Sequence, residues 1–260
     1  MSKILVFHGT DHKVGTTMIA QSVAEVAADA DTGYKVLMLS LNNREGLEYV
    51  KGKGETIEGI KASIDSQVLD KEEFFSRCKK TKNLYMLGGI CTPGNGRHYF
   101  PETAAYLINT FRDDFDLIIG DSGNSPDSGL AIGALIEADI RCCVFTQQET
   151  ALERFKIITS LYENINVMFD VLAVNKYEES DPYDLAYINS RLGVDENRMI
   201  KIEDTSRYAR QAERDRKSLL NYKNNDRYKQ DITALANLLL QKEGMEPIRA
   251  QRKKKWINFT

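Results

Sequence analysis

The sequence predicts an α/β fold in which a single domain is built on a mostly parallel sheet with helices on both faces. Short apolar runs rich in β-formers alternate with segments of helical periodicity along the chain, which is typical of parallel sheets that are covered on both sides. With 260 residues, of which 42% are hydrophobic, the chain can bury one large core. We find no internal repeat and no second domain in the pattern.

The stretch of residues 3–28 carries the first strand, a polar turn and the first helix. The apolar run 4–7 predicts a strand buried on both faces, and apolar residues at helical spacing after Thr17 predict a helix. The turn between them places successive backbone N–H groups beside a helix N-terminus, which is the geometry of a phosphate-binding loop. The alternative is an ordinary strand-to-helix turn with one glycine.

The turn lacks the lysine of a standard phosphate-binding loop. That loop reads GxxxxGK[ST], in which the lysine reaches the phosphates and the hydroxyl binds Mg²⁺. Counting back from Thr17 as the hydroxyl, Gly15 is in place, Thr16 holds the lysine position and Thr10 holds the first glycine position. Lys13 lies three residues before the lysine position, and we hypothesise that it delivers a cation to the same phosphates.

The elements that follow keep the alternation. After the break at Gly33, residues 34–41 (YKVLMLSL) predict a second buried strand. A charged loop punctuated by glycines then leads to a helix in two pieces over 56–80, with a turn around 65–70. A short strand over 84–87 comes next. A helix is predicted over 101–113, because its apolar residues share one face.

The next strand ends in a candidate metal-binding acid. Residues 115–123 read FDLIIGDSG, so Asp121 stands at the carboxyl end of a buried strand, where ligands of open α/β sheets bind. In proteins with phosphate-binding loops, such an acid orients the Mg²⁺ ion or its water. The alternative is that Asp121 only caps a turn, since Asp-Ser-Gly is a common turn sequence.

The second half repeats the same pattern. Apolar β-rich runs predict strands over 140–146, 169–175 and 199–202. Helical spacing predicts helices over 128–138, 150–164, 184–192, 206–215 and 231–242. The chain then has about seven strands joined by right-handed crossovers.

The composition argues against several classes of protein. A net charge of −3 and a pI near 5.8 do not favour nucleic-acid binding. No apolar run approaches the roughly 18 residues of a membrane span, and the N-terminus enters a strand at once, so we expect no secretion signal. We therefore expect a cytoplasmic protein.

Taken together, the order of these segments resembles the MinD/ParA class of deviant Walker ATPases. The segments are the VGTT loop, KVLMLSLN, NLYMLGG, FPETAAYLINTFRDDFDLIIGDSG, IRCCVFTQQETALERFKII, VLAVNK and MIKIEDTSRYARQAERDRKSLL. Within the class, the chain looks most like the pilus-positioning CpaE/TadZ branch, whose loop ends VGTT or VGTS. The resemblance covers residues 3–240 and implies a P-loop NTPase fold. It also implies an ATP-binding protein that forms a homodimer with nucleotide between the subunits and locates a partner.

The resemblance also assigns roles to individual residues. The implied nucleotide-binding positions are Lys13, Val14, Gly15, Thr16, Thr17, Asn175 and Asp204. Thr17 would bind Mg²⁺, with Asp121 as the switch acid. Asn175 matches the asparagine that touches adenine, and Asp204 ends the segment that covers the base. The alternative for Asn175 is a turn residue at the end of a strand.

Departures from the family pattern bear on catalysis. The family loop reads KGGxGK[ST], and here Asp11-His12-Lys13 occupies its first Lys-Gly-Gly, so an acid that would repel phosphates replaces the lysine that crosses the dimer interface. Active members end the second strand in Asp-x-Asp, where this chain has Ser40-Leu41-Asn42. Because phosphoryl transfer depends on positioning and electrostatics, we expect hydrolysis that is very slow or absent.

A basic and aromatic tail follows the predicted domain. We place the P-loop domain at residues 1–244 and the tail at 245–260. The tail contains five cations and three large apolar residues, namely Arg249, Arg252, Lys253, Lys254, Lys255, Trp256, Ile257 and Phe259. This composition suits contact with an anionic membrane surface at the inner face of the membrane. The alternative is a solvated or partner-docking tail.

The sequence leaves two main functions open. The first is a nucleotide-gated positioning or scaffold protein of a cell-envelope, pilus, secretion or partition system, in which ATP binding with Mg²⁺ sets dimerisation. The retained Thr17, Asp121 and Asn175 favour it. The second is a nucleotide-free pseudo-ATPase that serves as an interaction module, which Asp11, His12, Lys13 and Ser40 favour. An active partition-type ATPase comes third.

Overall fold

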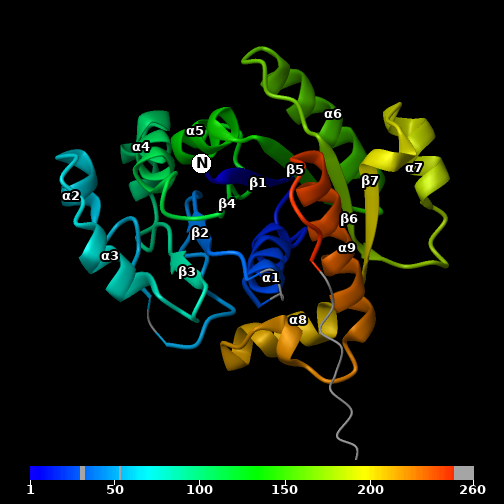
Figure 1. The fold of residues 1–260 in the computed structure, drawn as a ribbon. Coiled ribbons are helices and arrows are strands. Elements are labelled where there is room, and N and C mark those ends of the chain that lie inside the picture. Colours follow the sequence, from blue (N-terminus) through cyan, green and yellow to red (C-terminus); the bar gives the residue numbers. More distant parts are fainter. Residues whose placement is uncertain (30–32, 53, 249–260) are drawn as a thin grey trace, which may run out of the picture.

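The structure, a computed structural model, describes residues 1–29, 33–52 and 54–248. Within these residues, seven parallel strands form one sheet between two layers of helices (Figure 1). The strands are β1 (Lys3–Gly9), β2 (Val36–Ser40), β3 (Leu84–Leu87), β4 (Leu117–Asp121), β5 (Ile140–Thr146), β6 (Val171–Tyr177) and β7 (Met199–Glu203). Their order across the sheet is β3-β2-β4-β1-β5-β6-β7.

The helices are α1 (Thr16–Asp29), α2 (Lys61–Asp65), α3 (Lys71–Cys78), α4 (Pro101–Phe111), α5 (Gly129–Glu137), α6 (Glu149–Glu163), α7 (Leu185–Leu192), α8 (Ser206–Asp215) and α9 (Asp226–Lys242). Helices α1 to α7 lie between successive strands, and α8 and α9 follow β7. Three 3₁₀ turns lie at Asn95–His98, Glu196–Arg198 and Leu219–Asn221. In the part of the chain that is described, no helix is both long and apolar enough to cross a bilayer.

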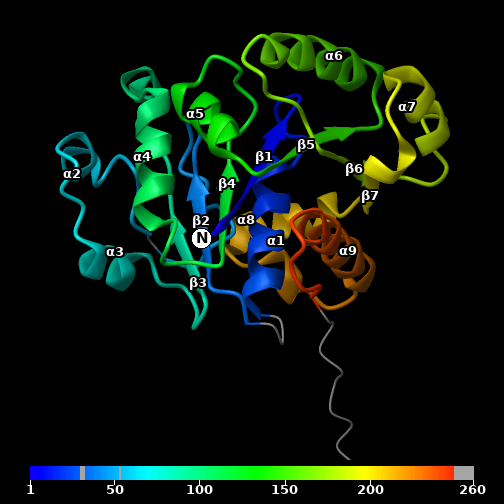
Figure 2. The same ribbon diagram turned by 45° about the horizontal axis from the view of Figure 1, so that its top comes forward.

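The sheet is buried on both faces, which explains the uninterrupted apolar runs of its strands. Along β1, Ile4 and Val6 point into one core and Leu5 and Phe7 into the other, because successive side chains of a strand alternate. The first core is closed by residues of α4, α5 and α6, and the second by residues of α1 and α9. Figure 2 shows α1 and α9 together on one side of the sheet and α6 on the other.

The strand order creates a binding edge at the middle of the sheet. β1 lies between β4 and β5. The chain passes from β1 to β2 and β3 on one side of the sheet, returns to β4, and then continues on the other side with β5, β6 and β7. Ligands of open α/β sheets bind at such a reversal, beyond the carboxyl ends of the strands. Phe7 of β1 and Ser40 of β2 both pair in register with Asp121, so the loops after these three strands leave the sheet together.

The predicted fold class is confirmed, and two predicted strands, 84–87 and 140–146, have the observed ends. The last helix begins at Asp226 rather than at residue 231. Its first turn reads DRYKQ, which carries little apolar signal, but Tyr228 is fully buried there and bonds with the Ser22 hydroxyl at 2.9 Å.

The start of the predicted tail is attached to the last helix. The backbone N–H of Ile248 donates to Asn237 Oδ1 at 2.6 Å, and Asn237 Nδ2 donates back to Ile248 O at 3.1 Å. The basic and aromatic positions, residues 249–260, lie outside the described residues. Their predicted contact with a membrane stays a prediction.

Candidate nucleotide-binding site

The turn between β1 and α1 forms an open cradle of backbone amides. Lys13 and Gly15 have positive φ values of 60° and 95°, so left-handed backbone conformations recur directly before the helix begins at Thr16. Alternating backbone conformations of this kind point successive N–H groups inward and form an anion-binding nest. The first turn of α1 contains no acidic residue, which leaves its N-terminal partial positive charge free to attract phosphate.

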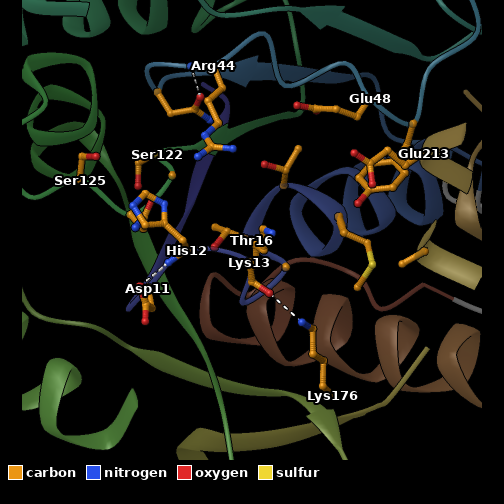
Figure 3. Close-up of a pocket in the computed structure, with 18 of the residues that line it drawn as sticks. Asp11, His12, Lys13, Thr16, Arg44, Glu48, Ser122, Ser125, Lys176 and Glu213 are labelled. Atoms are coloured by element: carbon orange, nitrogen blue, oxygen red, sulfur yellow. Dashed lines mark hydrogen bonds between the residues drawn. The ribbon is translucent and has the colours of Figure 1, made fainter. Parts of the chain in front are cut away.

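Two residues at the end of β6 hold this loop from behind. Asn175 is fully buried, and its Nδ2 donates to Val14 O at 2.6 Å. The ammonium of Lys176 donates to Lys13 O at 2.7 Å (Figure 3). A Cβ at Gly15 would lie far inside van der Waals contact with Asn175 Nδ2. Glycine is therefore required at position 15 both for its positive φ and for this close approach.

The two residues predicted to bind Mg²⁺ are in direct contact. Thr17 Oγ1 donates to Asp121 Oδ2 at 2.6 Å, and Asn42 Nδ2 donates to the same oxygen at 2.9 Å. The Gly123 N–H donates to the other carboxylate oxygen at 3.0 Å. Burial raises the pKa of Asp121 to about 6, although these three donors act to lower it. Thr17 and Asp121 thereby place a hydroxyl and a carboxylate, the oxygen groups that Mg²⁺ prefers, at the foot of the loop.

A cavity of about 790 Å³ opens above the loop, within the range of small-molecule sites (Figure 3). Its walls come from the loop, the segment after β2, the segment after β4, and α8. Residues of these walls that matter below are Lys13, Gly15, Thr16, Thr17, Asn42, Arg44, Glu48, Ser122, Ser125, Lys176, Arg210 and Glu213. A second cavity of about 390 Å³ lies beside it and shares Lys13 and Lys176.

The structure brings most, but not all, of the predicted residues to these cavities. Four loop positions line the first cavity, while Val14 and Asp204 line the second. Asp121 lies beneath Thr17 and is fully buried. Asn175 lines neither cavity in the described structure, because its side chain holds the loop. Asp204 Oδ1 accepts from the Ser206 hydroxyl at 2.5 Å and from its N–H at 3.0 Å.

The side chain at the lysine position stays inside the loop. Thr16 is buried, and a Cβ at Gly9 would overlap its Oγ1, so the hydroxyl packs over the end of β1. A threonine side chain is short and uncharged. Thr16 therefore offers no positive charge to a phosphate above the loop. The missing lysine is therefore not replaced from its own position.

The acid of the loop lines both cavities, but its charge is paired with a cation. Asp11 forms an ion pair with Arg154 of α6, and one of its carboxylate oxygens also accepts from the His12 N–H at 2.6 Å. Figure 3 draws Asp11 on the far side of the loop from Glu48 and Glu213. The repulsion expected from Asp11 is thus reduced by a cation that lies 143 positions further along the chain, as counted from the two residue numbers.

Sequence reasoning missed several residues that the fold brings to the site. Arg44 and Glu48 reach the cavity from the loop after β2, and Arg154 and Lys176 reach the phosphate loop from α6 and β6. Glu48 Oε2 is buried and has no hydrogen-bond partner among the described residues. A charge-rich segment directly after the second strand was the only signal available for the first two.

A buried histidine lies beneath the wall of the cavity. His8 Nδ1 lies 2.9 Å from Ser122 Oγ, and the Tyr162 hydroxyl lies 3.2 Å from His8 Nε2. Because Ser122 Oγ donates to Phe7 O at 2.9 Å, its oxygen accepts from His8 Nδ1, and Nε2 then accepts from Tyr162. Burial lowers the pKa of His8 to about 3, so the imidazole is neutral in the folded protein.

Comparison with known proteins identifies the fold. No family model matches the chain, and no curated protein sequence matches it. Among solved structures, the ParA family ATPase from Chlorobium tepidum TLS is similar, with a TM-score of 0.78 and 19% identity over 91% of this chain and 99% of that one. The septum site-determining protein MinD from Pyrococcus horikoshii OT3, complexed with Mg-ADP, has a TM-score of 0.73 and 16% identity over 94% and 98% of the two chains.

A third similar structure contains a partner protein. The MinC:MinD cell division protein complex from Aquifex aeolicus matches with a TM-score of 0.68 and 16% identity over 96% of this chain and 99% of that one. At these identities the likeness establishes the fold. The chain therefore has the fold of the ParA and MinD ATPases along nearly its whole described length.

Proposed function

We propose, from the fold it shares with the ParA and MinD ATPases, that this protein binds ATP with Mg²⁺ and uses nucleotide to form a homodimer. In this proposal it is a positioning or scaffold protein of the CpaE/TadZ type, which helps localise a pilus, secretion or other cell-envelope assembly. Its hydrolysis of ATP is weak or absent. The observation that carries the proposal is the hydrogen bond between Thr17 and Asp121 at the foot of a cavity of about 790 Å³.

The donor set fits Mg²⁺ bound together with phosphate. Thr17 and Asp121 supply a hydroxyl and a carboxylate, and Asn42 orients the carboxylate from the other side. Glu48 adds to the wall of the same cavity a buried oxygen that has no hydrogen-bond partner in the described part of the chain. Mg²⁺ would neutralise phosphate charge there, since it takes oxygen ligands and is usually shared between one or two carboxylates and substrate phosphates. The loop amides of residues 13–17 would hold the phosphates.

The residues that would drive hydrolysis are missing. Thr16 packs over Gly9 where a lysine would reach the phosphates, and Asp11 is paired with Arg154. At the end of β2, Ser40 is buried and Asn42 donates to Asp121, so neither can act as a carboxylate that positions water. Weak catalysis follows, because loss of a principal charge from such a site costs several powers of ten in rate.

We expect calorimetry to show Mg-ATP binding below millimolar concentration and sedimentation to show a dimer only with nucleotide. Thr17→Ala should weaken binding by about 10- to 100-fold, since removal of a group that positions a metal has effects of that size. Thr233→Ala, which removes a hydroxyl bonded to Lys229 O on α9, is the matched control and should bind like the wild type. Sustained turnover above about one per second would contradict the proposed weak hydrolysis.

The alternative function is a nucleotide-free interaction module. Its support comes from the contacts of the loop. Asn175 and Lys176 donate hydrogen bonds to two loop carbonyls, and Asp11 places an acid in the turn. The same titration separates the two functions, because absence of binding at millimolar Mg-ATP selects the interaction module. An active partition-type ATPase, the third possibility, requires the sustained turnover named above.

We also propose that the basic and aromatic part of the tail, residues 249–260, contacts the anionic inner face of the membrane. The intact protein should sediment with anionic vesicles, and a chain ending at Ile248 should not, because each basic residue near such a surface contributes about 1 kcal/mol. Neutral vesicles are the control. Equal binding of the two chains to anionic vesicles would show that the tail is not an anchor.

A further inference from the structure

Arg44 is a cation in the wall of the cavity. It follows β2, and its guanidinium group is turned toward the phosphate loop (Figure 3). In the part of the chain that the structure describes, this guanidinium forms neither an ion pair nor a hydrogen bond. An arginine that faces a cavity with all its donors free is suited to bind an anion there.

The backbone of Arg44 is held firmly, so only its side chain is free to adjust. Its N–H donates to Asn42 Oδ1 at 2.8 Å, and its carbonyl accepts from the Ile90 N–H at 3.0 Å. The next carbonyl, that of Glu45, accepts from the Gly89 N–H at 2.8 Å. A Cβ at Gly89 would overlap Arg44 O, so the two segments pack at backbone distance. The arginine is thereby presented from a rigid base.

One side chain connects this base to the predicted metal site. Asn42 accepts from the Arg44 N–H and donates through Nδ2 to Asp121. Asp121 in turn accepts from Thr17 at the start of α1. An aspartate at position 42 could accept from Arg44 but could not donate to Asp121. The amide therefore fixes the arginine and the acid relative to each other.

The other cations near the cavity fall into two groups. The Lys176 ammonium donates to Lys13 O, and Arg154, which does not line the cavity, pairs with Asp11. Lys13 and Arg210 line the cavity without an ion pair in the described part of the chain, but only Arg44 is bonded through its backbone to Asn42, the side chain that contacts Asp121. In Figure 3, Arg44 lies with Ser122 and Ser125 on one side of the cavity, and Glu48 and Glu213 lie on the other. Because the Ser122 hydroxyl donates to Phe7 O, Arg44 and Ser125 supply the donors for phosphate oxygens on this side.

We propose that Arg44 binds the terminal phosphate of a nucleoside triphosphate and supplies the charge that Thr16 does not. The inference rests on the proposed function, since it assumes that nucleotide occupies this cavity. Loop amides would hold the inner phosphates, while Arg44 reaches across from the wall formed after β2. Its planar fork can donate two hydrogen bonds to one phosphate. The site would then distinguish triphosphate from diphosphate through a residue outside the phosphate loop.

The test compares Mg-ATP and Mg-ADP affinities by calorimetry on the full-length protein. Arg44→Ala should weaken Mg-ATP binding by about 10- to 100-fold and change Mg-ADP binding by less than about threefold, as expected for loss of charge-assisted hydrogen bonds to one phosphate. Arg44→Lys should recover only part of the loss, because an ammonium lacks the fork. Arg97→Ala, an exposed arginine that does not line the cavity, is the control.

The possible results separate this inference from the proposed function. If the wild type binds Mg-ATP and Arg44→Ala binds it equally well, Arg44 is not the phosphate residue although the proposed function stands. Arg44 is also ruled out if Arg44→Ala loses Mg-ATP and Mg-ADP equally, or if Lys13→Ala or Arg210→Ala alone shows the selective loss. If the wild type binds neither nucleotide, the proposed function and this inference both fail.

Discussion

Replacing Gly15 with alanine is expected to lower the free energy of unfolding by about 4 kcal/mol, as the sum of backbone strain and a lost buried hydrogen bond. Gly15 has a φ of 95°, which an alanine adopts only with strain. The added Cβ would also displace Asn175 Nδ2, which is fully buried and donates to Val14 O. Urea unfolding followed by circular dichroism measures the change. Mg-ATP binding should disappear with it, because the loop amides move.

A matched glycine separates strain from the contact. Gly94 has a similar φ of 84°, but a Cβ there would meet nothing within 4 Å. Gly94→Ala should therefore cost only about 1 to 2 kcal/mol, the strain alone. In Gly15→Ala combined with Asn175→Ala, the two costs should not add, because both variants lose the same hydrogen bond to Val14. Equal costs for Gly15→Ala and Gly94→Ala would show that Asn175 does not constrain the loop.

The fold could be predicted because a parallel sheet covered on both faces makes its strands apolar throughout. The apolar run of β5 predicted a buried strand without knowledge of the strands beside it. The predicted ends of β5 are those observed. The start of α9 shows the limit of this reasoning. Tyr228 stands alone among charged residues there, and only the packing of α9 on α1 shows that it is buried.

Two residues of the candidate site, Thr17 and Asp121, could be predicted because one lies at the start of a helix and the other at the end of a strand. Thr17 follows the turn before α1, Asp121 ends β4, and the parallel sheet brings such points to one edge. The fold therefore joins residues that are 104 positions apart in the chain. Both residues were predicted to bind Mg²⁺, and the structure places them in contact.

The charges around that contact could not be predicted, because they depend on side-chain direction. The sequence places Asp11 in the phosphate loop, but the structure turns it toward Arg154. Arg44 follows β2 in an irregular segment, where periodicity gives no direction for a side chain. In the sequence, Asn42 stands where active members of the resembled family have an acid. In the structure its amide is the group that joins Arg44 to Asp121. A single amide thus determines a partner of each of the other two residues.

The buried imidazole of His8 should make the protein sensitive to acid. The pKa of His8 is lowered from 6.5 to about 3 by burial, so the folded protein stays neutral at this position while the unfolded chain takes up a proton below pH 6.5. Stability is then unaffected above that pH and falls by about 1.4 kcal/mol per pH unit below it, down to about pH 3. Over the range from pH 7.5 to 4.5, the His8 contribution amounts to about 3 kcal/mol.

The variant His8→Gln isolates this contribution, because its amide can bond with Ser122 and Tyr162 but cannot take up a proton. At pH 7.5 we expect the variant to be the less stable protein, since the stacking of His8 on Phe169 is lost. At pH 4.5 it should equal or exceed the wild type in free energy of unfolding. Asp121, whose raised pKa of about 6 favours the folded state on acidification, is common to both proteins and cancels in the difference. His98→Gln, at an exposed position, should follow the wild type. If the gap between His8→Gln and wild type stays constant from pH 7.5 to 4.5 in urea unfolding, burial does not keep His8 neutral, and its hydrogen bonds to Ser122 and Tyr162 must accommodate the imidazolium.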